Sequence, residues 1–295
     1  MDGDTTGGDS AAADCTASAA IIPNAQSPCA DITMGSSYPT PALRRERYLF
    51  SEPPLATTLR DMTQAQGSTM LTLRTFYHTL RISVPTVLEG SIGRTSAERC
   101  DARLLDWAHT LVRITRTQLQ VSGHSHFPAE PCIVMSNHQS LCDVPLLYAA
   151  LPTGVRLRMI AKAELFKVPI WGRAMRVAGF IPIDRGDRGQ AVASLEAAGR
   201  DIRKGTFVWL APEGTRSKTG ALGPLKKGGF MLAQATGLPI LPVVLRGTRN
   251  VLPPTGLRTY FNQQAAIEFR PVISTHGRSI EEVMSEVQKA IDPLT

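Results

Sequence analysis

The stretch CIVMSNHQSLCDVPLL, residues 132–147, contains three kinds of sequence in succession. It begins with a short apolar run that ends at Ser136 and is typical of a buried strand. A polar loop follows, and from Val144 onward the apolar residues are spaced as in a helix. Strand, loop and helix in this order predict one unit of an α/β structure.

The same alternation continues toward the C-terminus. Further short β-prone runs occupy residues 157–161, 180–183, 207–210 and 240–245. Helical patterns cover residues 144–151, 170–178, 189–204, 229–236 and 279–291. We therefore expect residues 118–295 to form a single α/β domain whose mixed sheet is mostly buried between flanking helices.

Two amphipathic helices are predicted ahead of this domain, within residues 46–117. In the first, apolar residues recur every three or four positions from Met70 to Val87, and arginines lie elsewhere on the helical wheel. The second has the same kind of pattern around Trp107. Such a hairpin is either an interfacial anchor, with its apolar side chains in lipid, or an ordinary helix pair packed on a core.

The N-terminal residues 1–45 differ in composition from the rest. They are rich in small and polar residues and nearly lack aromatic side chains, so we expect them to be disordered. The first 42 residues contain five aspartates and no lysine or arginine. The rest of the chain is therefore more basic than the net charge of +7 indicates, which favours phosphate groups, nucleic acid or anionic lipid as partners.

The cysteines and the uncharged segments limit the class of protein. The five cysteines are odd in number and lack paired short spacings, so neither a disulfide framework nor a zinc site is expected, which favours a reducing compartment. No positively charged and then apolar leader is visible at the N-terminus, so a signal peptide is not expected. The uncharged run 228–245 has a Gly-Leu-Pro break, which predicts helix, turn and strand in place of a membrane span.

The polar loop after Ser136 contains the first candidates for chemistry, His138 and Asp143. Asp143 can hydrogen-bond one imidazole nitrogen and leave the other free as a general base. Taken alone, the same pair also fits a helix cap beside a loop histidine. Ser140 lacks the sequence of a nucleophile elbow and Cys142 lies in an apolar run, so neither is favoured as a nucleophile.

Other loops that follow predicted strands supply further candidates, because ligands of α/β sheets bind at the carboxyl ends of the strands. Arg185 follows one predicted strand and Arg216 follows the next, and two guanidinium groups can clamp one phosphate. Near Arg216, Gly214 permits close backbone approach and Thr215 supplies a hydroxyl. Lys162 ends another predicted strand at the same edge.

Together these loops resemble the PlsC-like glycerolipid acyltransferases, which form the lysophosphatidic acid acyltransferase family. The resemblance covers roughly residues 118–272, and the four sequence blocks of the family occur in order, at residues 137–143, 179–185, 212–216 and 238–243. The run Lys226-Lys227-Gly228 follows the third block, as is usual in such proteins. One departure is that many relatives begin with a strongly apolar segment, whereas this chain has only the arginine-bearing helix near residues 70–88.

The resemblance implies a direct acyl transfer that forms no acyl-enzyme. His138 would remove the proton from a lysolipid hydroxyl, and the oxygen would attack the thioester of acyl-CoA or acyl-carrier protein. Asp143 would orient His138 and stabilise the imidazolium. Neither a metal nor a cofactor is implied.

The resemblance also implies a site for the acceptor. Arg185, Gly214 and Arg216 would contact its phosphate, Glu213 would order their loop, and Lys162 is a looser assignment to the same phosphate. The substrate-binding set that we expect is Lys162, Arg185, Glu213, Gly214, Thr215 and Arg216.

The function implied is that of a 1-acyl-sn-glycerol-3-phosphate O-acyltransferase, which converts lysophosphatidic acid to phosphatidic acid in phospholipid synthesis. O-acyltransfer to another lysolipid, such as a lyso-ornithine lipid, and a non-catalytic lipid-binding role remain alternatives. The expected partners are a lysophospholipid, acyl-CoA or acyl-carrier protein, and an anionic membrane surface. Nucleic-acid binding is not expected, because its recognition modules are missing.

The resemblance also favours the interfacial reading of the helical hairpin. The protein would then lie on the cytoplasmic face of the inner, or plasma, membrane as a peripheral or monotopic protein.

Overall fold

The computed structural model describes residues 67–294 apart from 185, 187 and 257. Within these residues a seven-stranded sheet has the order β1-β7-β6-β2-β5-β3-β4. Every neighbouring pair is parallel except β6 and β7, so the sheet is mixed, as predicted. The strands are β1 (Gln118–Ser122), β2 (Ile133–Ser136), β3 (Leu157–Lys162), β4 (Ile181–Ile183), β5 (Phe207–Leu210), β6 (Ile240–Arg246) and β7 (Gln264–Phe269).

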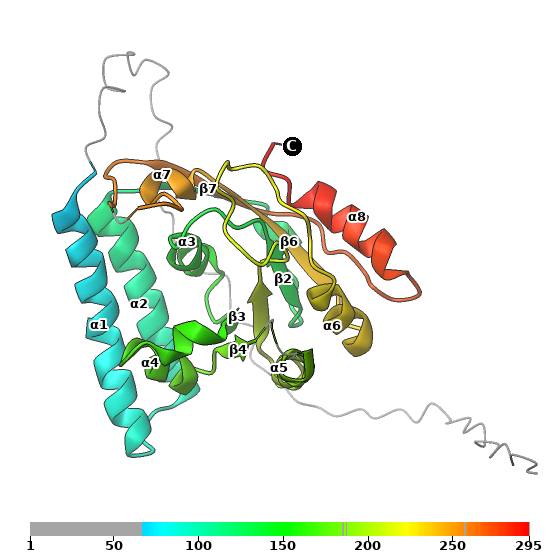
Figure 1. The fold of residues 1–295 in the computed structure, drawn as a ribbon, viewed down its shortest axis with the longest axis horizontal. Helices are drawn as coiled ribbons and strands as arrows, with labels where there is room; N and C mark the ends of the chain where they lie inside the picture. Colours follow the sequence, from blue (N-terminus) through cyan, green and yellow to red (C-terminus); the bar gives the residue numbers. More distant parts are fainter. Residues whose placement is uncertain (1–66, 185, 187, 257, 295) are drawn as a thin grey trace, which may run out of the picture. The chain divides into compact units, whose positions relative to one another are not determined.

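Helices cover both faces of the sheet. In Figure 1, α2 and α3 lie on one side of the sheet, and α5, α6 and α8 lie on the other. The α-helices are α1 (Thr69–Ser91), α2 (Ala97–Thr115), α3 (Asp143–Ala150), α4 (Trp171–Val177), α5 (Arg188–Arg203), α6 (Gly228–Thr236), α7 (Thr248–Val251) and α8 (Ile280–Ala290). Two 3-10 turns, η1 (His124–His126) and η2 (Ala163–Lys167), complete the described elements. This is the predicted α/β architecture with flanking helices.

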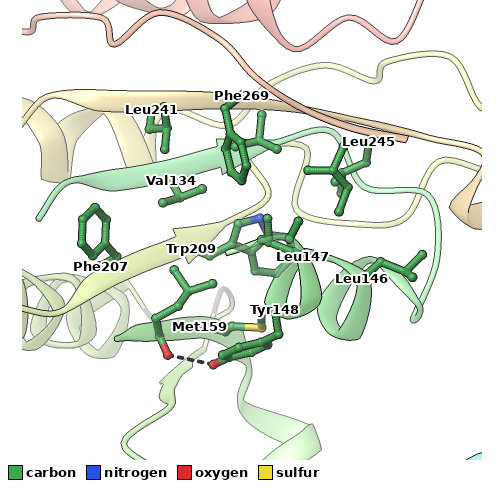
Figure 2. Packing of buried hydrophobic residues seen from close by; sticks show 14 of the residues in the cluster. Val134, Leu146, Leu147, Tyr148, Met159, Phe207, Trp209, Leu241, Leu245 and Phe269 are labelled. Carbon is green, nitrogen blue, oxygen red and sulfur yellow. Dashed lines mark hydrogen bonds between the residues drawn. The ribbon is translucent and has the colours of Figure 1, made fainter. Parts of the chain in front are cut away.

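The central strands are apolar on both faces because both faces are buried. Along β2, Ile133 and Met135 pack toward α5, α6 and α8, whereas Val134 packs toward α2 and α3. On β5, Val208 and Trp209 divide in the same way. Figure 2 shows Trp209 among apolar side chains from neighbouring strands and from α3, where the hydroxyl of Tyr148 donates to the backbone oxygen of Leu157 at 2.7 Å.

The helical hairpin is present, and an ion pair joins it to the sheet. α1 packs against α2 and α4, and α2 packs against α3. The guanidinium of Arg158, buried on β3, lies 2.6 Å from the carboxylate of Asp101 on α2. A buried arginine needs a counter-charge close by, so this pair joins the N-terminal part of α2 to the sheet.

Helix α1 differs from an ordinary packed helix because its outer face is also apolar. Its buried side combines apolar residues, such as Leu71 and Ile82, with the hydroxyl groups of Ser83 and Thr86, each of which donates to a backbone oxygen one turn earlier. Apolar side chains also lie on the outside, with Phe76 60% and Leu88 62% exposed. The other exposed apolar residues of this face and its C-terminal end are Met70, Leu73, Tyr77, Val84 and Ile92. Among the helices described, none combines the length and the apolar composition needed to cross a bilayer.

The structure confirms one part of the sequence prediction, adds two strands that were not predicted, and does not describe a third part. Strands β2 to β6 and the helices between them occur within one or two residues of the predicted bounds. Strands β1 and β7 were not predicted at all. The expected disorder of residues 1–45 lies outside the described residues, and the predicted boundaries at 45 and 117 remain predictions.

Candidate functional site

The site is built where the loops that follow β2 and β5 meet. The two strands are neighbours in the sheet and run parallel, so their carboxyl ends lie at the same edge. The backbone N–H of His138, after β2, donates to Oε1 of Glu213, after β5, at 2.8 Å. The N–H of Ser217 donates in return to the backbone oxygen of His138 at 2.7 Å. These bonds bring together the first and third blocks of the sequence.

His138 and Asp143 form the pair that their spacing predicted. Nδ1 of His138 lies 2.6 Å from Oδ2 of Asp143. The same oxygen accepts the backbone N–H groups of Gln139 at 2.7 Å and Ser140 at 2.9 Å. Three donors on one oxygen suit an ionised carboxylate, which accepts only, so the imidazole proton lies on Nδ1. Asp143 therefore orders the loop before the helix, which is not the geometry of a helix cap.

The environment leaves one atom of the pair available for chemistry. The side chain of Asp143 is fully buried, whereas that of His138 is 19% exposed. Nε2 of His138 has no hydrogen-bond partner among the residues that the structure describes. A neutral imidazole whose tautomer is fixed by a buried carboxylate, and whose other nitrogen is accessible, can act as a general base.

Neither nearby nucleophile is free to replace this base. The hydroxyl of Ser140 donates to the backbone oxygen of Leu252 at 2.6 Å and accepts the N–H of Cys142. Burial, with the Asp143 carboxylate as a smaller cause, raises the pKa of the Cys142 thiol to about 12. Cys142 is therefore a neutral thiol near pH 7, which is a poor nucleophile.

Glu213 points into the protein, where it joins three segments. Its Oε2 accepts the N–H of Gly223 at 2.8 Å while Oε1 accepts that of His138. The carboxyl is 5% exposed, and this burial raises its pKa above the usual 4.5. Both carboxylate oxygens of Glu213 are bound to backbone N–H groups. This arrangement fits the loop-ordering role expected for Glu213 better than direct contact with a ligand.

The other expected substrate residues lie in different surroundings. Gly214 has a φ of 75°, a left-handed backbone conformation that favours glycine at this turn of the loop. Thr215 is exposed, and the half-buried Arg216 makes no ion pair with any residue that the structure describes. Lys162, at the end of β3, is exposed and pairs with Glu164 at 3.2 Å. Arg185 lies outside the described residues.

Asn137 is a site residue that the sequence reasoning missed. Its side-chain amide donates to the backbone oxygen of Leu245 on β6 at 2.8 Å, and its oxygen accepts the N–H of Leu245 at 2.7 Å. The buried side chain thus continues the pairing of β2 with β6 after the strand has ended. The available signal was a polar amide directly after a buried strand, since such a group must find partners inside the protein.

No metal site is visible in the part of the chain that the structure describes, since no three His, Cys, Asp or Glu side chains gather there as ligands. The expectation that no cofactor takes part stays a prediction.

Comparisons with known proteins find relatives of part of this chain. Residues 118–246 match the model of a protein family described as Acyltransferase. The chain is 39% identical over 135 residues to a chloroplastic 1-acyl-sn-glycerol-3-phosphate acyltransferase of Brassica napus, covering 45% of this chain and 38% of that protein. It is 34% identical over 168 residues to 1-acyl-sn-glycerol-3-phosphate acyltransferase alpha of Mus musculus, covering 56% and 58%. The chain thus spans only about half of the length of the curated relatives that it matches.

A solved structure shares the fold. The crystal structure of the 1-acyl-sn-glycerophosphate acyltransferase PlsC from Thermotoga maritima superposes with a TM-score of 0.61 at 24% identity. The match covers 75% of this chain and 93% of that one, so it includes elements outside the family match.

The double hydrogen bond of Asn137 predicts a large effect on stability. Replacing Asn137 by Ala leaves the buried N–H and C=O of Leu245 without partners, so we expect the free energy of unfolding to fall by about 2–4 kcal/mol. Chemical denaturation of the two proteins measures it. Asn250→Ala, at an exposed position on α7, serves as the control and should change stability by less than about 0.5 kcal/mol. Equal effects of the two substitutions would contradict the role given to Asn137.

Proposed function

We propose that this protein is a 1-acyl-sn-glycerol-3-phosphate O-acyltransferase, because residues 118–246 match the model of the Acyltransferase family and the fold is similar to that of PlsC. It transfers a fatty acyl group from a thioester to the sn-2 hydroxyl of lysophosphatidic acid and forms phosphatidic acid. The observation that carries the proposal is the His138–Asp143 pair at 2.6 Å, with one imidazole nitrogen left accessible at the edge of the sheet.

The chemistry proposed needs one base and no covalent enzyme intermediate. Nε2 of His138 accepts the proton of the acceptor hydroxyl as that oxygen attacks the carbonyl carbon of the thioester. The carbon–sulfur bond then breaks, and the thiolate of CoA or of acyl-carrier protein leaves and takes the proton from the imidazolium. The Asp143 carboxylate stabilises the positive charge on His138 between these two proton transfers.

Phosphate recognition is assigned in this proposal to the loop after β5. Arg216 is a half-buried cation without an ion-pair partner among the described residues, one position before Ser217, which hydrogen-bonds the backbone of His138. A guanidinium on the loop that is hydrogen-bonded to the His138 backbone can bind the acceptor phosphate while the base acts on the hydroxyl. Gly214 and Thr215 contribute a close backbone approach and a hydroxyl, and Arg185 and Lys162 complete the proposed set.

The outer face of α1 supports a membrane surface as a further partner. A helix that buries hydroxyl groups and exposes Phe76 and Leu88 is stable in contact with lipid, where its apolar side can leave water. Val168 and Ile170, just before α4, are also exposed, and α4 packs against α1. The exposed cation of Arg74 suits anionic head groups. We therefore propose peripheral binding at the cytoplasmic face of the membrane.

Removing the base should abolish turnover. His138→Ala, assayed with labelled acyl-CoA and a panel of lysolipids, is expected to lower kcat by about 10²–10⁴-fold. His276→Ala, at an exposed position, is the matched control and should retain wild-type activity. Equal turnover by His138→Ala and the wild type would overturn the mechanism. If the wild type prefers a lysolipid other than lysophosphatidic acid, the acceptor in the proposal is wrong while the chemistry stands.

Arg216→Ala tests the phosphate site. We expect KM for phosphate-bearing acceptors to rise at least about tenfold, because a charge-assisted hydrogen bond is lost, with a much smaller change for uncharged acceptors. Lys218→Ala removes an exposed cation from the same loop and should leave both KM values within about twofold. The same loss on both acceptor classes in Arg216→Ala would place the phosphate elsewhere.

The outer face of α1 can be tested with vesicles. Phe76→Ser should weaken binding to vesicles that contain anionic lipid by about fivefold or more, because about 1 kcal/mol or more of apolar transfer is lost, while the thermal unfolding midpoint stays unchanged. Met231→Ser, which alters an exposed apolar residue on α6, is the control and should not affect binding. A wild-type protein that stays in the supernatant at low salt would contradict the membrane proposal.

A further inference from the structure

The peptide group that joins Asn137 to His138 is held by side chains at both of its polar atoms. Its carbonyl oxygen accepts the hydroxyl of Ser136 at 2.8 Å. Its N–H donates to Glu213 at 2.8 Å. A peptide plane held at its oxygen by a residue of β2 and at its nitrogen by a residue after β5 has little freedom to rotate, and it fixes the backbone from which the His138 side chain leaves.

The hydroxyl of Ser136 is itself oriented by Trp209. The indole Nε1–H donates to Ser136 Oγ at 2.9 Å, so the hydroxyl proton is directed toward the Asn137 oxygen. All three groups are buried, where water cannot replace a lost partner. These two successive hydrogen bonds, from Trp209 to Ser136 and from Ser136 to the peptide before His138, are called the relay below.

The same indole also borders the imidazole. The ring centroids of Trp209 and His138 lie 5.7 Å apart with an interplanar angle of 81°, an edge-on arrangement. Trp209 is a core residue, packed among Val134, Leu147 and their neighbours (Figure 2), so it cannot move aside. One side chain thus restrains His138 twice, through the backbone relay and through direct contact between the rings.

We propose that Ser136 and Trp209 are positioning residues for the general base, an inference that rests on the proposed function of His138. Neither contacts the reacting atoms. They hold the imidazole so that Nε2 points toward the acceptor hydroxyl. The base is then already aligned when the substrate binds. Their removal should lower kcat and leave substrate binding intact.

Steady-state kinetics of Ser136→Ala, Trp209→Phe and the double variant test this role. We expect kcat to fall about tenfold or more in Ser136→Ala, with KM for donor and acceptor within about twofold of the wild type. Because both residues act through one relay, the double variant should lose less than the product of the two single losses. Unchanged kcat in Ser136→Ala, or fully multiplicative losses, would overturn the proposal.

A matched control separates positioning from general destabilisation. On α2, Trp107 also donates its indole N–H to a hydroxyl, that of Thr79, at 3.1 Å. Trp107→Phe removes a bond of the same kind away from His138, so kcat in mixed micelles should stay at the wild-type value. A loss of kcat in Trp107→Phe equal to that in Trp209→Phe would show that stability alone is being measured.

Fluorescence provides a readout that needs no substrate. Indole emission depends on the groups in contact with the ring, so the difference in emission between the wild type and His138→Gln at one pH reports this ring pair. Ser136→Ala should alter that difference, and an unchanged difference would contradict the relay. If the wild type transfers no acyl group, the proposed function fails, while the fluorescence still decides whether the relay orients His138.

Discussion

The need to satisfy buried polar groups at the end of β2 determines the arrangement of the site. The chain leaves this strand through polar residues that are almost completely buried, among them Asn137, Gln139 and Ser140. Buried polar atoms without partners are costly, so most polar groups of this loop are bonded to other segments, and of its buried side-chain atoms only Gln139 Oε1 and Asp143 Oδ1 have no hydrogen-bond partner among the described residues. Leu245 on β6, Glu213 after β5 and Leu252 after α7 supply partners to the loop.

The sequence predicted the architecture well where the physical signal was local. Apolar runs and helical spacing are properties of neighbouring residues, so β2 to β6 and their helices were found. Strand β1 was missed because its residues alternate between half-buried and exposed at an edge, and its pairing partner β7 lies far along the chain. The His138–Asp143 pair could be predicted for the same reason, since its members lie only five positions apart in the sequence.

The rest of the site depends on contacts that no local pattern encodes. The hydrogen bonds from Asn137 to Leu245 and from Trp209 to Ser136 join residues on different strands. In the sequence Trp209 resembles any other core aromatic residue, and its indole N–H acquires a role only because β5 pairs with β2. The apolar stripe of α1 was predicted correctly, but whether it faces protein or solvent depends on the hydroxyl-bearing face that packs on α2.

The long sequence separations within the site also have a consequence for synthesis. His138 is held by a side chain 75 residues later, and Asn137 by a backbone group 108 residues later. A nascent chain therefore carries its histidine long before it carries the groups that align it. The residues that order the loop around His138 are complete only after β6 has been synthesised, and the contacts they make are of long sequence separation, which form slowly in folding.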